Sequence, residues 1–311
     1  MLGGEHDLVR AYGLANRSTG TPVTAGTRFA TASGSKSMTA LVVVSLIESG
    51  ALTFETDARG LLGEDLPLID DDVTVRHLLT HTSGIGDYLD EDELETSDYV
   101  LTRPVHTYLT TSDFLGDLDG HPQAFAPGER FAYCNGGFVV LALLAERAAG
   151  TGYHELVRSR VLEPAGMTES GFFRSDRLPA DTAVGYLSED DDAISHVFHL
   201  PILGTGDGGL YTTAADVHRF WTALLAGAIV SPALLAQMLS VQVEISDDPD
   251  DYGLGFWLRP SEDGTPDPAM EGQDAGVSFV SRHDRSEGVT RTVLANTSEG
   301  AYAMWETLLG G

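Results

Sequence analysis

The chain has 311 residues, of which 42% are hydrophobic, so it can bury one large core or two sub-domains that share a core. Its formal net charge of −29 repels phosphate backbones and argues against a nucleic-acid partner. A single cysteine excludes an internal disulfide. No apolar run is long enough to span a membrane and no export signal is visible, which predicts a cytoplasmic protein.

The first elements in chain order are two strands and a buried helix. The segments His6–Gly13 and Thr27–Ala32 predict strands that are separated by a polar turn region. Ser33–Gly50 predicts a helix, because Ser33 can cap its start, Gly50 can end it and its middle is apolar almost all round. A helix that is apolar on every face is buried, so its polar first turn should meet a cleft.

Helices dominate the middle of the chain, and strands return near its end. This order predicts an α+β protein in which an antiparallel sheet from both chain ends is flanked by helices and carries an inserted, mostly helical sub-domain. No linker or repeat is visible, so residues 1–311 are predicted to form a single catalytic unit. Its α/β part is predicted at 1–55 and 205–311, and its helical part at 56–204. The further elements predicted are helices at 74–80, 137–150, 154–162, 214–226 and 301–309, and strands at 254–258 and 289–295.

One basic residue differs from all the others. The chain has eighteen lysines and arginines, and Lys36 is the only lysine among them. A lysine amine can lose its proton when it is desolvated, whereas a guanidinium stays charged. The use of a single lysine therefore points to a role that needs a neutral amine.

Ser33 lies three residues before Lys36, so the two side chains share one face of the predicted helix. A serine hydroxyl needs a base before it attacks a carbonyl, and a neutral Lys36 can take or relay its proton. The N-terminus of a helix also favours the negative charge that develops on the reacting oxygen. The alternative is an accidental Ser-x-x-Lys pair on an exposed turn, and the spacing alone does not decide between the two.

A second candidate pair, Tyr133 and Asn135, precedes the helix predicted at 137–150. Residues two apart in an extended segment point the same way, so a phenol and an amide reach one site. A nearby ammonium group would lower the pKa of the phenol and make Tyr133 a candidate general base. In the alternative, Tyr133 packs under the helix and Asn135 caps it. Cys134 points the opposite way and is expected to be a small buried hydrophobe, not a nucleophile.

Six segments of the chain form an ordered set: FATASGSKSMTA (29–40), LLTHTSGI (78–85), FAPGERFAYCNGGF (125–138), VLEPAGMTESGFF (161–173), GTGDGGLYTTAADVHRF (204–220) and YGLGFWL (252–258). In this order they resemble the serine β-lactamase and penicillin-binding family. The likeness is closer to its class C branch, which includes esterases and D-amino-acid peptidases, and it extends from about Phe29 to Asn296. It implies an antiparallel sheet flanked by helices, a mostly helical sub-domain and a site at their junction.

The resemblance assigns roles to the candidate residues. It implies that Ser33 is the acylated nucleophile, that Lys36 is its partner and that Tyr133 stands at the position of the general base. Asn135 would hold Lys36 and the acyl-side amide of the substrate. This chemistry needs no cofactor and no metal.

One family motif departs from the pattern in this chain. The Lys-Thr-Gly or His-x-Gly triplet of the family aligns here with Met270, a glutamate and Gly272. Met270 then stands where a cation would bind a substrate carboxylate, which puts anionic substrates in doubt, and Arg282 is one candidate substitute. The backbone N–H of Gln273 would remain the second oxyanion donor, opposite that of Ser33.

Two other groups of polar residues are assigned neither a catalytic nor a metal-binding role. His77 and His81 are spaced like a metal pair on a helix, but the resemblance implies structural roles, and the sequence offers no third ligand. The acidic runs lack calcium-loop spacing and are predicted to be solvated loops. They lie at 64–72, 87–98, 189–192 and 247–251.

The start of the chain is a second departure from the family. Relatives usually have a helix and a full first strand before the segment at 6–13, but only five residues precede it here. Either the start is abbreviated or the sheet lacks an edge strand.

The leading hypothesis is a serine hydrolase that cleaves an ester, or less readily an amide, through an acyl-Ser33 intermediate. Its substrate would be a small ester, amide or peptide-like molecule. A β-lactamase or D-Ala-type carboxypeptidase is the alternative, and a non-catalytic relative that binds an acyl or peptide ligand is a further one. A Ser-His-Asp α/β-hydrolase is excluded because its G-x-S-x-G motif is absent. The sequence leaves the natural substrate and the oligomeric state open.

Overall fold

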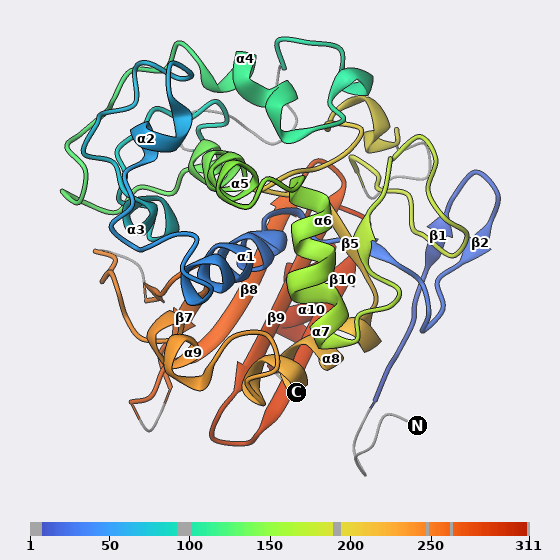
Figure 1. Cartoon of the computed structure of the whole chain (residues 1–311). Helices are drawn as coiled ribbons and strands as arrows, with labels where there is room; N and C mark the ends of the chain where they lie inside the picture. The colour runs from blue at the N-terminus through green and yellow to red at the C-terminus, as the bar shows by residue number, and fades with distance from the viewer. Residues whose placement is uncertain (1–7, 92–100, 189–193, 247–248, 262–263, 310–311) are drawn as a thin grey trace.

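The computed structural model describes residues 8–91, 101–188, 194–246, 249–261 and 264–309 (Figure 1). Antiparallel sheets pack with helices in these ranges, which confirms the predicted α+β class. None of the described helices is both long enough and apolar enough to cross a bilayer.

A five-stranded sheet lies on one side of the molecule (Figure 1). Its strands are β6 (Asp251–Tyr252), β7 (Trp257–Arg259), β8 (Asp267–Asp274), β9 (Val277–Asp284) and β10 (Val289–Ala295). The order is β10-β9-β8-β7-β6, and every pairing is antiparallel. β8 and β9 form a hairpin that places Asp274 opposite Val277, and Gly276 adopts φ +72° in its turn.

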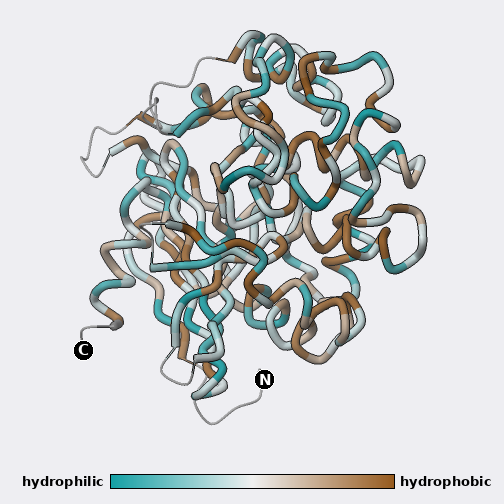
Figure 2. Tube along the Cα trace, turned by 90° about the vertical axis from the view of Figure 1, so that its left-hand side faces the viewer, coloured by the Kyte–Doolittle hydropathy of each residue, from teal (hydrophilic) through white to brown (hydrophobic). Residues whose placement is uncertain are grey.

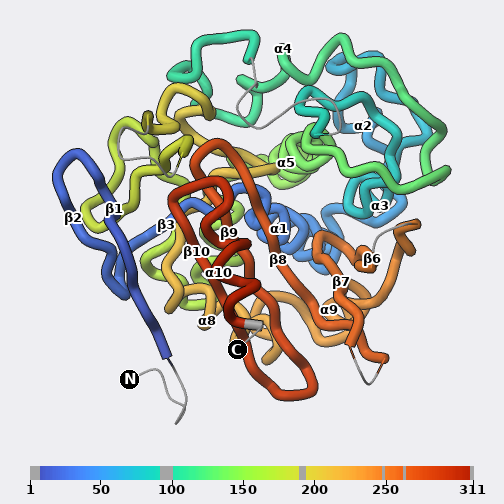
Figure 3. The backbone as a smooth tube through the Cα atoms, turned by 180° about the vertical axis from the view of Figure 1, so that it is seen from behind, coloured from blue at the N-terminus to red at the C-terminus, as the bar shows by residue number. Residues whose placement is uncertain are grey.

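The N-terminal strands form a separate sheet. They are β1 (Leu14–Asn16) and β2 (Thr21–Pro22), which pair with each other. The expectation of one sheet built from both chain ends is therefore wrong, because all five strands of the main sheet come from residues 251–295. Seen from behind, β1 lies to the side of β10 (Figure 3).

The described chain before β1 lies in no strand. Every residue from 8 to 13 is exposed, so this segment buries no face, and the strand predicted at 6–13 does not form over its described part. The start of β1 is attached to the residue after β10, since Asn296 Nδ2 donates to the Leu14 carbonyl at 3.1 Å. β10 is therefore the edge of the main sheet.

A three-stranded sheet joins three distant parts of the chain. Its strands are β3 (Phe29–Ala30), β4 (Gly171–Phe172) and β5 (Leu210–Thr212), in the order β3-β5-β4. The strand predicted at 27–32 is shortened to β3, because the chain enters the 3₁₀ helix η1 (Ala32–Ser35). This sheet brings η1 beside the residues that precede β5.

Two buried helices carry the site residues. They are α1 (Lys36–Glu48) and α5 (Asn135–Ala149), and Figure 1 places α1 between α5 and the main sheet. The residues from Ala40 to Val44 have no exposed surface, as expected for a helix that is apolar on every face. α1 begins three residues later than predicted, because η1 forms the turn before it.

The other predicted helices are found with small shifts at their ends. Those at 74–80, 214–226 and 301–309 correspond to α3, α8 and α10, whereas the one at 154–162 divides into α6 and a π turn, η4. The strand predicted at 254–258 is displaced to β7. The bounds are α2 (Ala58–Leu62), α3 (Val75–Leu79), η2 (Val105–Thr107), η3 (Thr111–Phe114), α4 (Leu115–Leu118), α6 (Tyr153–Val157), η4 (Arg158–Leu162), α7 (Glu163–Ala165), η5 (His196–Phe198), α8 (Ala214–Leu225), α9 (Pro232–Met238) and α10 (Gly300–Leu309).

One large apolar core extends through the helices and the main sheet. It includes side chains of α1, α5, α8, β8 and β9. Figure 2 shows apolar residues in the helical and sheet parts of the trace alike. The division of residues 1–311 at 56 and 205 stays a prediction.

Candidate active site

The candidate nucleophile Ser33 lies in η1, immediately before α1. The residue before it, Ala32, adopts φ +44°, a left-handed conformation that costs a non-glycine residue about 1–3 kcal/mol. Such strain persists only where the surroundings hold it. Here it accompanies a sharp turn that leaves Ser33 partly exposed in the wall of a cavity.

Lys36 is buried, with 2% of its surface exposed, and its amine is surrounded by acceptors. The Nζ atom lies 2.8 Å from Ser33 Oγ, 2.7 Å from Asn135 Oδ1 and 2.9 Å from the Asp207 carbonyl. Burial lowers the pKa of Lys36, and the charge of Asp207 is the largest opposing influence. A neutral amine satisfies this geometry, because it can donate to Asn135 and Asp207 and accept the hydroxyl proton of Ser33.

Tyr133 lies beside the amine of Lys36, which is the group that contacts Ser33 Oγ. Its ring stacks on His81 with centroids 4.4 Å apart, and its centroid lies 4.9 Å from Lys36 Nζ. Burial raises the pKa of Tyr133 well above its usual value, and the charge of Glu91 raises it further. The expected lowering of this pKa is therefore wrong. The phenol stays protonated, so the geometry favours Lys36 as the base and Tyr133 as a proton relay.

Asn135 is the first residue of α5, and its side chain faces the amine of Lys36. Its Nδ2 donates to the Leu89 carbonyl at 3.0 Å and to Glu91 Oε1 at 2.8 Å. The alternative in which Asn135 caps the helix does not hold, because Cys134 occupies that position and its Sγ accepts a first-turn N–H at 3.3 Å. Cys134 is buried, as expected.

A carboxylate predicted to belong to a solvated loop fixes the position of Asn135. Asp87 accepts the backbone N–H groups of Asn135 at 2.6 Å and of Gly136 at 2.8 Å, at the N-terminus of α5. Burial raises the pKa of Asp87 to about 6, against the lowering effect of these hydrogen bonds. The acidic run at 87–98 thus supplies two site groups, Asp87 and Glu91. Their place directly after the LLTHTSGI segment is the sequence signal that could have located them.

Strand β8 runs directly against η1 at Gly272. A Cβ at this position would lie 2.2 Å from the Thr31 carbonyl oxygen and 2.7 Å from the backbone nitrogens of Ser33 and Gly34. The position therefore requires a glycine, because any side chain would force the two segments apart. Gln273 lines the same cavity as Ser33, and this close approach supports its backbone as the second oxyanion donor, which stays a prediction.

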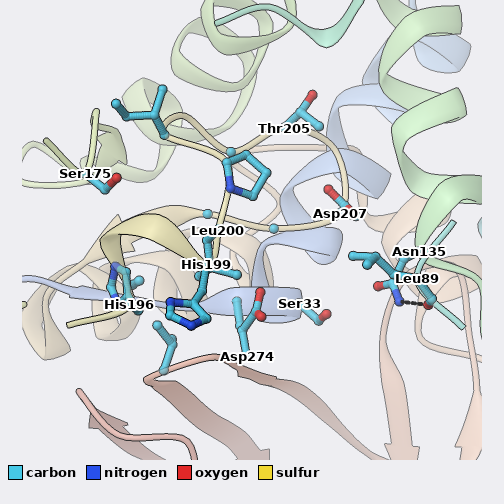
Figure 4. A pocket seen from close by; sticks show the side chains of 18 of the residues that line it. Ser33, Leu89, Asn135, Ser175, His196, His199, Leu200, Thr205, Asp207 and Asp274 are labelled. Atoms are coloured by element: carbon cyan, nitrogen blue, oxygen red, sulfur yellow. Dashed lines mark hydrogen bonds between the residues drawn. The ribbon is translucent and has the colours of Figure 1, made fainter. Parts of the chain in front are cut away.

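The cavity lined by Ser33 spans about 860 Å³, part of it open to solvent, and its lining includes the carboxylates of Glu91, Asp207 and Asp274. Figure 4 shows Asp207 and Asp274 near Ser33. Burial raises the pKa of Asp207, and it raises the pKa of Asp274 to about 7 with a further contribution from the charge of Asp207. No arginine is among the described residues that line it. The cavity therefore opposes an anionic substrate.

Asp274→Asn should stabilise the protein above neutral pH. The folded carboxyl titrates near 7 and the unfolded one near 4, so the folded protein binds more protons between these values and loses stability as the pH rises through them. Because Asp274 keeps some contact with solvent, we expect a gain of about 2 kcal/mol at pH 8 that vanishes below about pH 4. Urea unfolding at a series of pH values measures it.

The matched control is Glu306→Gln, at an exposed carboxylate of α10, which should change the unfolding free energy by less than about 0.5 kcal/mol. A destabilised Asp274→Asn variant at pH 8 would show that the fold prefers the charged carboxylate at this position.

The two histidines of the LLTHTSGI region make local contacts. His77 Nδ1 accepts the Thr74 N–H at 3.2 Å at the start of α3, and His81 Nδ1 accepts the Cys134 N–H at 3.0 Å. Over the described ranges, no three or more His, Cys, Asp or Glu side chains are grouped so that they could hold a metal ion. His81 acts on the site by supporting the ring of Tyr133.

Comparison with known proteins agrees with this geometry. The family model described as Beta-lactamase matches residues 2–304. The chain belongs to the Beta-lactamase family. A penicillin-binding protein from Bacillus halodurans, known from its crystal structure, has a TM-score of 0.92 and 36% identity, over 99% of this chain and 94% of that one. The predicted family and fold are confirmed.

Relatives of this chain carry the names of different activities and binding functions. Esterase EstB of Burkholderia gladioli is 30% identical, over 93% of this chain and 82% of that protein. Penicillin-binding protein 4* of Bacillus subtilis is 29% identical over 83% of this chain, and a D-aminopeptidase of Cereibacter sphaeroides is 26% identical over 96% of it. The chain spans 58% and 56% of these last two proteins. Membership of the β-lactamase-related family is thus confirmed, and the relatives named as an esterase and a D-aminopeptidase agree with the predicted hydrolase class.

The position aligned with the cation of the Beta-lactamase family lies outside the cavity. Met270 is 2% exposed and packs with Met38 and Phe279 beneath η1. Arg282 does not replace the cation, because its guanidinium pairs with Asp267 at 2.7 Å and does not line the cavity. Neither Met270 nor Arg282 therefore offers a substrate carboxylate a positive partner.

Proposed function

We propose that the protein is a serine hydrolase that cleaves an ester, or less readily an amide, through an acyl intermediate on Ser33. The observation that carries the proposal is the 2.8 Å contact between Ser33 Oγ and the buried amine of Lys36. Burial favours the neutral form of that amine, which can accept the hydroxyl proton. The esterase and D-aminopeptidase among the relatives support this class of substrate.

The reaction follows from the contacts around Ser33. Lys36 takes the hydroxyl proton while Ser33 Oγ attacks the carbonyl carbon, and the backbone N–H groups of Ser33 and Gln273 hold the oxyanion. Tyr133 hands a proton to the leaving group and regains one from Lys36. A water molecule then attacks the acyl-enzyme, and the same two side chains accept its proton and return one to Ser33 Oγ.

Neutral or cationic substrates fit the site better than anionic ones. A β-lactam or a peptide C-terminus carries a carboxylate, which meets three cavity carboxylates and no cation from Met270 or Arg282. The net charge of −29 repels it at longer range as well. A β-lactamase or D-Ala-type carboxypeptidase remains the second candidate, because penicillin-binding proteins are among the relatives.

The test compares wild type with Ser33→Ala on nitrophenyl acetate and, separately, on a chromogenic cephalosporin. We expect the wild type to hydrolyse the ester and to carry an acyl mass on the peptide containing Ser33, and we expect the variant to show neither. Turnover of the cephalosporin alone would reverse the order of the two candidates. A wild type without turnover and without an adduct would favour the non-catalytic relative.

A further inference from the structure

The cavity has a second polar end that the proposed reaction does not use. Ser175, His196 and His199 line it, and Figure 4 shows Asp274 between the two histidines and Ser33. These residues come from the segment after β4 and from the region of η5. They line the same cavity as Ser33, on the far side of Asp274.

All three of these side chains bury a polar atom that has no partner. Ser175 Oγ, His196 Nδ1 and His199 Nδ1 are shielded from solvent, and none of them forms a hydrogen bond with any residue that the structure describes. His196 Nδ1 is packed against Gly185, so the atoms considered for a ligand are those of Ser175 and His199. Leaving a buried polar atom unpaired costs about 1–3 kcal/mol, so such atoms are uncommon away from sites that meet a ligand or water. Three of them among residues at one end of one cavity point to a hydrogen-bonding group supplied by the bound molecule, with Ser175 and His199 as its partners.

His196 fixes the shape of this end and keeps it uncharged. It is 4% exposed, and its ring lies so close to Gly185 that a Cβ there would be 1.8 Å from His196 Nδ1. Burial lowers the pKa of His196 to about 4, so the imidazole is neutral at pH 7. A rigid, neutral ring beside His199 brings no positive charge that would attract an anion.

The other residues that line the cavity limit which functional groups the ligand can carry. The carboxylates of Glu91, Asp207 and Asp274 disfavour an anionic group anywhere in the cavity. A hydroxyl and an imidazole can each donate or accept, which complements an amide or an alcohol, whereas an ammonium only donates and would lose its hydration. Apolar side chains form much of the wall and suit a hydrocarbon stem; they include Leu101, Phe173, Leu200, Ile202 and Tyr211.

We propose that Ser175 and His199 form a specificity subsite for an uncharged amide or hydroxyl group, carried by the substrate on an apolar stem beyond its scissile bond. The inference rests on the proposed function, because it names the substrate class of the same site. Binding such a group satisfies both orphaned atoms, and a purely hydrocarbon chain leaves them unpaired.

The experiment compares nitrophenyl esters of increasing chain length whose acyl groups end in methyl, carboxamide, carboxylate or ammonium. A parallel series keeps an acetyl group and varies the alcohol in the same way, so that both sides of the scissile bond are covered. At the length that reaches the subsite, we expect kcat/KM to favour carboxamide over methyl by about 10-fold or more, since each neutral hydrogen bond contributes about 1 kcal/mol and an unpaired atom costs more.

Ser175→Ala and His199→Phe should each reduce this preference by about 5- to 10-fold. Both should leave turnover of nitrophenyl acetate, which is too short to reach the subsite, within about 2-fold of wild type. The matched control is His106→Phe, at an exposed histidine of η2, which should keep the full preference. Ser175→Ala removes a single oxygen atom, so it tests the proposal even where His199→Phe fails to fold.

The outcomes separate this proposal from the one it rests on. Acetate turnover without a carboxamide preference in either series overturns the subsite and leaves the hydrolase intact. A stronger preference for ammonium or carboxylate than for carboxamide also overturns it, because a charged group would then be the ligand. Absence of all ester turnover in the wild type overturns the proposed function and the subsite together.

Discussion

Replacing Lys36 with arginine should lower kcat/KM for nitrophenyl acetate by about 10³-fold or more, because a permanent cation takes the place of an amine that can be neutral. The guanidinium does not lose its proton, so it cannot accept the one that Ser33 must give up. The guanidinium still places a positive charge beside Asp207 and Glu91, so a missing cation cannot explain the loss. Initial rates and the time course of the acyl mass on Ser33 measure it.

The wild-type enzyme should show the matching pH dependence. The pKa of Lys36 is lowered by burial, so the fraction of neutral amine, and with it the acylation rate, should rise with pH and level off below the usual pKa of a lysine. Arg130→Lys is the control for the variant, because Arg130 is an exposed cation over the Phe125 ring and should leave the rate unchanged. A Lys36→Arg variant that retained acylation within about 10-fold of wild type would place the base elsewhere.

The residues that local spacing can bring together were predictable from sequence. Ser33 and Lys36 are three residues apart at the start of a helix, and Tyr133 and Asn135 flank the start of another, so each pair is positioned by its own segment. The geometry places the other three around the amine of Lys36, with contacts of 2.8 Å from Nζ to Ser33 and 2.7 Å to Asn135. Their common site needed the order of the family segments as well, because 99 residues separate Lys36 from Asn135.

Groups whose role depends on tertiary burial were missed. Asp87, Asp207 and Asp274 are distant in sequence and unremarkable in an acidic chain, and they acquire raised pKa values because the fold removes them from water. The predicted lowering of the Tyr133 pKa failed for the same reason, since burial and the charge of Glu91 outweigh the nearby amine. Neither desolvation nor a distant charge can be read from spacing along the chain.

The sheet was less predictable than the helices. A helix such as α5 shows its apolar face within one segment, whereas strands need partners to show their register. The β8–β9 hairpin was not predicted from pattern, because Asp, Glu, Gln and Gly interrupt the apolar residues of β8. A glycine such as Gly272 usually weakens a strand, but here it is what allows η1 to lie directly against β8.

Gly272→Ala should lower kcat/KM for ester hydrolysis by about 10²–10³-fold. The new methyl group would overlap the Thr31 carbonyl oxygen at 2.2 Å and crowd the backbone nitrogen of Ser33 at 2.7 Å, so β8 must move away from η1. This displacement separates the N–H of Ser33 from that of Gln273, and losing one oxyanion donor costs about that factor in rate. The overlap should also cost about 1–3 kcal/mol of stability, measured by urea unfolding.

Gly208→Ala is the matched control for this effect. Gly208 lines the same cavity, but a Cβ there would meet its nearest neighbours, atoms of Ala32, at an ordinary 3.7 Å. We expect it to fold normally and to lose less than about 10-fold in kcat/KM, because nothing needs to move. Equal losses in the two variants would mean that any added bulk in the cavity impairs substrate binding. A loss confined to Gly272→Ala, with KM little changed and kcat reduced, places the defect in stabilisation of the transition state, where the contact between β8 and η1 puts it.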